Sequence, residues 1–110
     1  MRKKSVPALE RFRPEKMTKV NLFETQRFFC DLYCLLPGQE QKVHAHAAND
    51  KLYYALRGAL QVTVGAETAP LEAGEIVMAA AGEPHGIRNA SSAEAVCMVF
   101  MAPHPGWGKE

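Results

Sequence analysis

The sequence predicts an all-β sandwich or barrel, and three observations lead to this fold class. From about Thr18 onward, short apolar runs alternate with turn residues along the whole chain. Dipeptides that end in glycine separate many of these runs. No long segment carries an apolar stripe at helical spacing. Only Leu9 to Phe12, near the start, is expected to form a turn of helix.

The apolar runs define the strands, and the glycine dipeptides define the turns between them. Predicted strands are Lys19–Glu24, Arg27–Leu36, Gln41–His46, Lys51–Leu56, Ala59–Val64, Thr68–Glu72, Glu75–Ala80, His85–Asn89 and Ala95–Met101. Predicted turns lie at Pro37-Gly38, Arg57-Gly58, Val64-Gly65, Ala73-Gly74 and Ala81-Gly82. The chain is therefore divided into an arm over residues 1–17, a barrel over 18–103 and a tail over 104–110.

Several of these strands are apolar on both faces. In the strand that begins at Lys51, alternation places Lys51, Tyr53 and Ala55 on one side, and the apolar residues between them on the other. A sheet with two dry faces must be covered twice. The opposite sheet provides one cover, and the N-terminal arm or a second subunit provides the other. We therefore expect a homodimer.

Composition and charge narrow the classes of partner. Thirteen basic and twelve acidic residues in a chain of 110 leave almost no net charge, so neither nucleic acid nor a membrane is an expected partner. A small-molecule ligand is expected instead. The start of the chain lacks the apolar core of a signal peptide. The three cysteines have no paired spacing, which is typical of a reduced, cytoplasmic compartment.

The histidines are the candidate metal ligands. His44 and His46 stand two apart in a predicted strand, so both side chains point to the same face. His85 begins another predicted strand. Three neutral imidazoles with open positions suit divalent Zn, Fe, Ni, Cu or Mn. His104, in the tail, is expected to lie outside this site, and no organic cofactor is expected.

The spacing of glycines and histidines resembles the two motifs of the cupin superfamily, whose members are jelly-roll barrels, also called double-stranded β-helices. The resemblance covers roughly residues 18–103 and departs from the motifs at Lys51, where the family has Glu, and at Ala80, where it has Pro. The first motif here reads Gly38, QEQKV, His44, Ala45, His46, AAND, Lys51, LYYALR, Gly58, and the second reads Gly74, EIVMA, Ala80, Ala81, Gly82, Glu83, Pro84, His85, GIR, Asn89. The resemblance predicts the fold, but the family includes isomerases, dioxygenases, decarboxylases, storage proteins and sugar-binding modules, so it does not define a reaction.

Lys51 leaves four interpretations open, because an ammonium group has no lone pair and its charge repels a metal ion. Three histidines hold the metal, as the resemblance permits, and Lys51 faces the cavity mouth to anchor an anionic substrate or to act as a base. Alternatively, Lys51 is neutral and coordinates the metal. In a third interpretation Asp50 supplies the carboxylate, which requires a bulge in the strand. In the fourth there is no metal, and the histidines are polar groups that line a cavity.

Two classes of function follow from this site. The first is an enzyme in which the metal binds a small anionic or enolisable molecule, with dioxygenase-like or isomerase-like chemistry. The second is a non-catalytic module that binds or senses a small molecule, with or without metal. The catalytic residues are not defined by the sequence, because the nearest acids, Asp50 and the exposed Glu83, form no clear acid–base pair with the histidines. Whether the protein is an enzyme is left open here.

Overall fold

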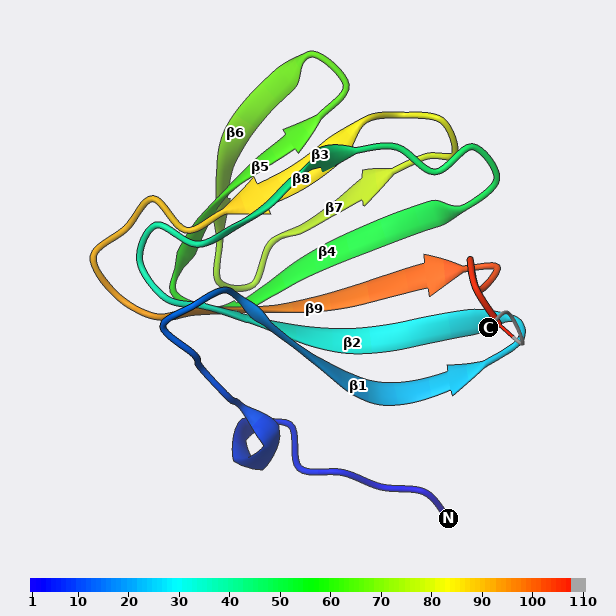
Figure 1. Ribbon diagram of the computed structural model, residues 1–110, viewed down its shortest axis with the longest axis horizontal. Helices are drawn as coiled ribbons and strands as arrows, with labels where there is room; N and C mark the ends of the chain where they lie inside the picture. Colours follow the sequence, from blue (N-terminus) through cyan, green and yellow to red (C-terminus); the bar gives the residue numbers. More distant parts are fainter. Residues whose placement is uncertain (108–110) are drawn as a thin grey trace.

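The computed structural model describes residues 1–107 and consists almost entirely of strands (Figure 1). A single turn of 3-10 helix, η1, spans Pro7–Leu9. The strands are β1 (Thr18–Thr25), β2 (Phe28–Leu35), β3 (Glu40–His44), β4 (Asp50–Arg57), β5 (Ala59–Val64), β6 (Glu67–Glu72), β7 (Ile76–Ala79), β8 (His85–Arg88) and β9 (Ala95–Ala102). The predicted all-β fold class is confirmed. Residues 108–110 of the predicted tail lie outside the described residues.

The strands form two antiparallel sheets that face each other (Figure 1). One sheet has the order β1-β2-β9-β4-β7 and the other has the order β3-β8-β5-β6. Strands that are neighbours in the sheets are mostly distant in the chain, as in a jelly roll. Loops join the two sheets at both ends, and the β3–β4 and β7–β8 loops lie at the same end as the end of β9 (Figure 1).

The predicted strand ends agree with the observed ones within one residue, with one consequential exception of two residues. The strand predicted over Gln41–His46 ends at His44, so His46 lies in the following loop and not in the strand. The predicted helical turn is also displaced, because the proline that opens it is Pro7 and not a residue of the Leu9–Phe12 segment. All five predicted turn glycines have positive φ.

The core lies between the sheets and is formed by residues that point inward from both. Lys51, Tyr53 and Ala55 of β4 are all buried there, as alternation predicted. The main apolar cluster consists of Met17, Tyr33, Leu35, Tyr53, Ala55, Leu60, Val62, Leu71, Ile87, Ala95, Cys97 and Val99. All three cysteines are free thiols, and two of them are fully buried.

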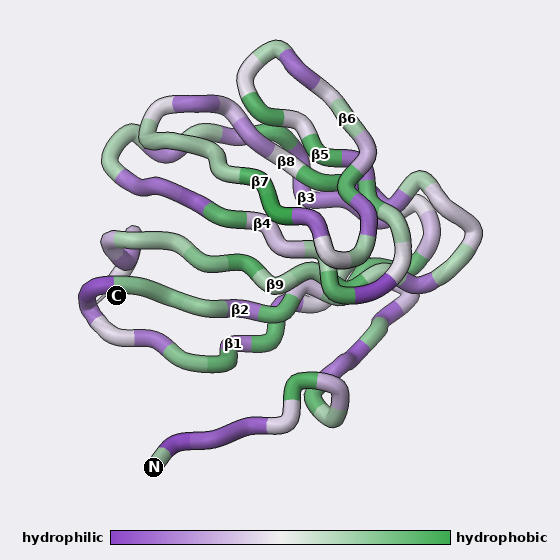
Figure 2. Tube along the Cα trace, turned by 180° about the vertical axis from the view of Figure 1, so that it is seen from behind, coloured by the Kyte–Doolittle hydropathy of each residue, from purple (hydrophilic) through white to green (hydrophobic). Residues whose placement is uncertain are grey.

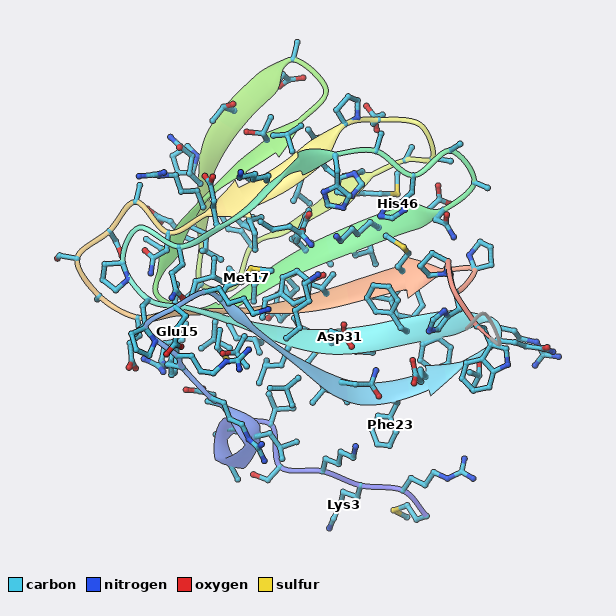
Figure 3. The ribbon with its side chains drawn as sticks, viewed as in Figure 1. Lys3, Glu15, Met17, Phe23, Asp31 and His46 are labelled. Atoms are coloured by element: carbon cyan, nitrogen blue, oxygen red, sulfur yellow. The ribbon has the colours of Figure 1, made fainter. Side chains whose placement is uncertain are left out.

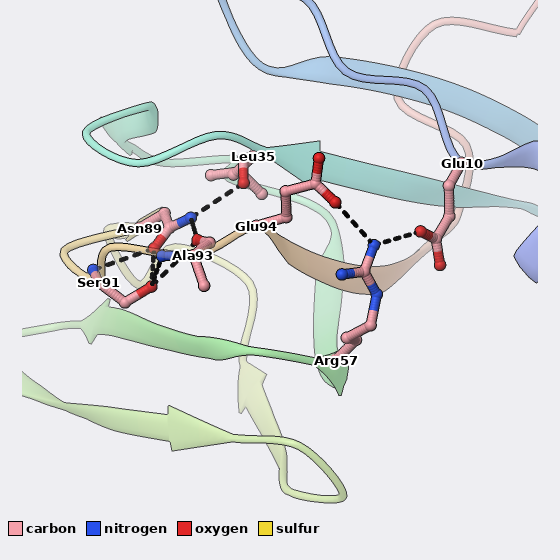
Figure 4. Close-up of polar contacts among 7 residues, drawn as sticks. All are labelled: Glu10, Leu35, Arg57, Asn89, Ser91, Ala93 and Glu94. Carbon is pink, nitrogen blue, oxygen red and sulfur yellow. Dashed lines mark hydrogen bonds and ion pairs between the residues drawn. The ribbon is translucent and has the colours of Figure 1, made fainter.

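The N-terminal arm covers part of the outer face of the five-stranded sheet. Val6, Leu9 and Phe12 pack against a second buried cluster formed by Leu22, Leu32, Cys34 and Val96. Arg57, at the end of β4, holds the arm in place through Glu10 and also contacts Glu94 (Figure 4). The arm therefore covers part of the second apolar face, which the sequence predicted to need a cover besides the opposite sheet.

The arm reaches only the end of β4, and apolar side chains remain exposed on the rest of β4 and on β7. Ile76 is 60% exposed, Met78 57% and Tyr54 37%. Alternation along β7 turns Met78 outward, and its neighbour Ala79 is buried. Figure 2 shows hydrophobic residues along β7 and β9.

Asn89 joins the end of β8 to the loop that leads into β9. Its side-chain amide donates to the carbonyl oxygens of Leu35 (2.9 Å) and Ala93 (2.8 Å), and its Oδ1 accepts from Ser91 (Figure 4). Asn89 is fully buried, so these bonds satisfy an amide that would otherwise be costly to desolvate.

No helix among the described residues has the length and apolar character needed to cross a membrane.

Candidate functional site

Three histidines converge between the sheets, as the sequence predicted. Each offers one ligand atom, and these atoms lie within 4.8 Å of one another. His44 and His85 are direct partners in the antiparallel pair of β3 and β8, with ring centroids 4.5 Å apart. The ring of His46, from the loop after β3, lies 4.9 Å from His44 and 5.7 Å from His85. We call these three residues the histidine triad.

A β-bulge in β3 positions the first of these rings. Between Gln41 and His44 the chain of β3 advances three residues while β8 advances two, from Ile87 to His85. The extra residue allows Gln41 and His44 to face the interior together, which regular alternation would prevent. Gly86 lies opposite the bulge, where a Cβ atom would come within 2.7 Å of the Gln41 carbonyl oxygen and 2.9 Å of the Val43 nitrogen. Only glycine fits at this position.

The loop that carries His46 is held by backbone contacts. The amide of Gly82 donates to the carbonyl oxygen of His46 at 2.8 Å. At the end of the same loop, the Asn49 side chain donates to the Pro103 carbonyl oxygen at 2.6 Å. These contacts fix His46 although it lies outside the strand.

Hydrogen bonds define the tautomer of two triad rings. His44 Nδ1 lies 2.8 Å from the Lys42 carbonyl oxygen, and His85 Nδ1 lies 2.9 Å from that of Glu83. A carbonyl oxygen only accepts, so each Nδ1 carries the proton and each Nε2 keeps a free lone pair. The Nε2 of His85 is buried and has no hydrogen-bond partner. A buried, unpaired lone pair next to two other imidazoles is what a metal ligand requires before it binds the ion.

The electrostatics of the site favour the neutral form of two triad rings, those of His46 and His85. Burial is the main cause that lowers the pKa of His85 to about 4, and the positive charge of Lys51 lowers it further. Burial also lowers the pKa of His46, with smaller contributions from His44 and Lys51. Metal ions bind neutral imidazole, so these rings are in the binding form at neutral pH. The residues present therefore fit a divalent transition metal.

Lys51 is 1% exposed and forms part of the cavity wall. Its ammonium donates to Gln41 Oε1 at 3.0 Å, and the Tyr53 hydroxyl donates to the same oxygen at 2.9 Å. The Gln41 amide nitrogen donates in turn to the Tyr33 hydroxyl at 3.2 Å. Burial lowers the pKa of Lys51 to about 8, and the charge of Lys19 contributes as well. Lys51 therefore faces the interior beside the triad, and its buried position differs from the expected one at the cavity mouth.

The other candidates from the sequence lie away from the triad. Asp50 is exposed, and its Oδ1 accepts from the backbone amide of Ala81, so the structure does not place it as a fourth ligand. Glu83 is exposed and accepts from the amide of Ala80. His104 pairs with Glu24 at 2.8 Å, outside the site, as expected.

A cavity of about 310 Å³ adjoins His44, His46 and Lys51. Its wall includes four polar side chains that the sequence reasoning did not identify: Lys19, Asp31, Tyr33 and Gln41. Figure 3 labels Asp31 on β2 and His46 in the loop above β4. Burial raises the pKa of the Asp31 carboxyl. The sequence does contain a signal that could have identified Asp31, because it is the only charged residue in the otherwise apolar strand FFCDLYCL.

The two sheets, the bulge and the triad define a class of protein, a small β-barrel with a histidine-lined cavity between its sheets. The sequence model of the family described as "Cupin domain" matches residues 31–101. This match covers more than half of the chain, so the chain belongs to the cupin family. The resemblance seen in the two motifs is thereby confirmed.

Solved structures and curated proteins agree with this assignment. The TT1209 protein of Thermus thermophilus is 50% identical, with a TM-score of 0.93, over 96% of this chain and 100% of that one. A Klebsiella pneumoniae protein with a double-stranded β-helix domain is 24% identical (TM-score 0.86; 94% and 90% coverage), and this similarity supports the fold alone. The polyketide synthase CurC of Streptomyces cyaneus is 33% identical over 84 residues, 73% of this chain. The chain spans only 54% of the length of CurC.

Proposed function

We propose that this protein is a metal-binding small cupin in which His44, His46 and His85 hold one divalent transition metal. The observation that carries this proposal is the buried and unpaired Nε2 of His85, directed among the other imidazoles. When bound, such an ion would polarise the oxygen of a small molecule at its open coordination positions. The chemistry would then be dioxygenase-like or isomerase-like.

The charge of the site favours an anionic or enolisable molecule. Three neutral imidazoles leave the full charge of a divalent ion uncompensated. The buried ammonium of Lys51 adds positive charge to the same cavity. In this proposal Lys51 acts as an electrostatic anchor, and Gln41 and Tyr53 fix its position. The half-buried carboxyl of Asp31 is available in the cavity wall to accept a proton.

A non-catalytic binding module is the second candidate, and one observation favours it. Asp31 already accepts a hydrogen bond from the Asn21 side-chain amide at 2.9 Å. The other nearby acids, Asp50 and Glu83, are bonded to backbone amides. The two candidates separate in an assay of oxygen uptake by iron-loaded protein on a panel of diketones and thiol carboxylates. Turnover supports an enzyme, and thermal stabilisation by a panel compound without turnover supports a binding module.

Metal analysis of the purified protein tests the triad itself. We expect about one equivalent of metal in the wild type after loading and dialysis, and a large loss in His46→Ala, whose half-buried ring can be removed without opening the core. His104→Ala is the matched control, because it removes the histidine outside the triad. Equal metal content in all three proteins would contradict the proposal.

The residue that replaces the usual Glu gives a separate test. Lys51→Glu removes a positive charge beside the triad and supplies an oxygen ligand, so metal affinity should rise. The measurement is competition with a chromophoric chelator, for wild type and variant side by side. Unchanged affinity would show that the side chain at position 51 does not act on the ion.

We propose further that the chain forms a homodimer through the outer face of β4 and β7. This face carries Leu52, Tyr54, Ile76 and Met78, and the cross-strand pairs Leu52–Met78 and Tyr54–Ile76 make it continuous. It extends the apolar face that the arm covers, and the exposed charged residues of β4, Asp50 and Arg57, lie only at the two ends of the strand, so a second copy is complementary to the apolar centre. Light scattering should give a dimer for wild type and a monomer for Ile76→Lys; a monomeric wild type would contradict this.

We also propose a cytoplasmic location, which the free thiols support.

A further inference from the structure

Two lysines share one aromatic ring in the cavity wall. Lys19 Nζ lies 5.4 Å from the centroid of the Tyr33 ring, and Lys51 Nζ lies 5.6 Å from the same centroid. The register of β1 and β2 pairs Lys19 directly with Tyr33, which brings this side chain to the cavity side of the sheet. Both lysines line the cavity of about 310 Å³ that adjoins the triad. Lys19 lies outside both sequence motifs.

The negative charge near these lysines does not balance them. Asp31 is the carboxylate in the cavity lining, and it already accepts from Asn21. Lys19 forms no salt bridge with any of residues 1–107. The cavity wall therefore carries excess positive charge whether or not a metal is bound, and such a surface concentrates anions.

The lysines and the triad are different parts of one cavity. Lys51 lies beside the triad, where it donates to Gln41, and its Nζ is 5.0 Å from the centroid of the Tyr53 ring. Lys19 approaches from β1, at the opposite edge of the sheet from β7. A ligand that reaches both parts needs two anionic groups with a short spacer between them.

We propose that Lys19 and Lys51 form a second anion subsite, so that the molecule bound in this cavity is a small dicarboxylate with one carboxylate at the triad and the other at the two lysines. This proposal rests on the metal-binding function proposed above. The cavity has the volume of about ten water molecules, which suits a ligand of this size. Lys19 is thus a specificity-determining residue, because it selects for the second charge.

Calorimetric titration of zinc-loaded protein with acetate, malonate, succinate and glutarate tests the subsite. We expect the wild type to bind the best dicarboxylate at least about tenfold more tightly than acetate, because a second charge-assisted contact is made. Lys19→Gln should reduce this preference about fivefold or more and leave zinc affinity unchanged. Lys42→Gln, an exposed lysine on β3, is the matched control and should behave as the wild type.

The outcomes separate the subsite from the metal site. Zinc binding without any preference for dicarboxylates, or a preference that Lys19→Gln leaves intact, would overturn the subsite and leave the metal-binding function standing. If zinc does not bind, succinate is titrated into the metal-free protein. Binding that weakens in Lys19→Gln and not in Lys42→Gln would then support the lysine subsite while the metal function fails.

Discussion

The buried charge of Lys51 makes the stability of this protein depend on pH in a predictable direction. The pKa of Lys51 is lowered from 10.5 to about 8 in the folded protein, mainly by burial. In the unfolded chain the same side chain titrates at its ordinary pKa. Between these two values the unfolded state binds the proton and the folded state does not. Stability from this group must therefore rise as pH increases, and below pH 8 the folded state carries the full cost of the buried charge.

The size of the effect follows from the shift. A difference of 2.5 pKa units corresponds to about 3 kcal/mol in the free energy of unfolding, gained between about pH 8 and pH 10.5. Between pH 7 and pH 9 the gain is about 1 kcal/mol. Other buried groups oppose this gain in stability at higher pH. Burial raises the pKa of Cys97 to about 12 and also raises that of Tyr33 and Tyr53, so the unfolded chain loses these protons first. Comparison with a variant that lacks only the lysine charge cancels these contributions.

Urea unfolding of wild type and Lys51→Met at pH 7 and pH 9, without metal, measures the effect. The variant keeps a side chain of similar length, and Tyr53 still donates to the Gln41 oxygen that Lys51 leaves. We expect the wild type to gain about 1 kcal/mol relative to the variant from pH 7 to pH 9. Parallel pH profiles would show that Lys51 is not buried as a charge. A fall in the stability of the wild type relative to the variant from pH 7 to pH 9 would contradict a lowered pKa of Lys51.

Three further substitutions test the supports of the site. Gly86→Ala should destabilise the protein by about 1–3 kcal/mol in urea unfolding and reduce bound metal, because its Cβ would strike the bulge in β3; Gly106→Ala, with no atom within 4 Å, should do neither. Asn89→Ala should cost about 2–4 kcal/mol in the same assay, since it removes buried hydrogen bonds, and the exposed Asn21→Ala should cost less than about 1 kcal/mol; equal effects would contradict the role of burial. Glu24→Ala should alter the fluorescence of Trp107, the only tryptophan, because it releases His104, whose ring lies 5.6 Å from the indole; identical spectra would show that the pair does not order the tail.

The sequence predicted the fold well because its signals were local and repeated. Glycines at turn positions and alternating apolar residues are properties of short segments, and they led to strand bounds close to the observed ones. Alternation also placed Lys51 and Tyr53 correctly on one face of β4, although the burial of Lys51 was not expected. The convergence of the histidine triad followed from the motif spacing.

The parts that the sequence missed depend on contacts between distant segments. The bulge in β3 is defined by its register against β8, so nothing in the segment QEQKVH itself revealed that Gln41 would share a face with His44. Lys19 and Asp31 line the cavity, but they lie on strands that carry neither motif. The exposed apolar face of β4 and β7 is likewise a property of tertiary packing, because the N-terminal arm covers only part of this sheet.

The central claim is that three imidazoles bind one ion, and a crystal of metal-supplemented protein tests it most directly. Anomalous scattering collected on both sides of the absorption edge of the added metal should give one peak, about 2.0–2.1 Å from the Nε2 atoms of His44 and His85 and from a ring nitrogen of His46. Absence of a peak at saturating metal, with a water molecule bonded to His85 Nε2 in its place, would contradict the account.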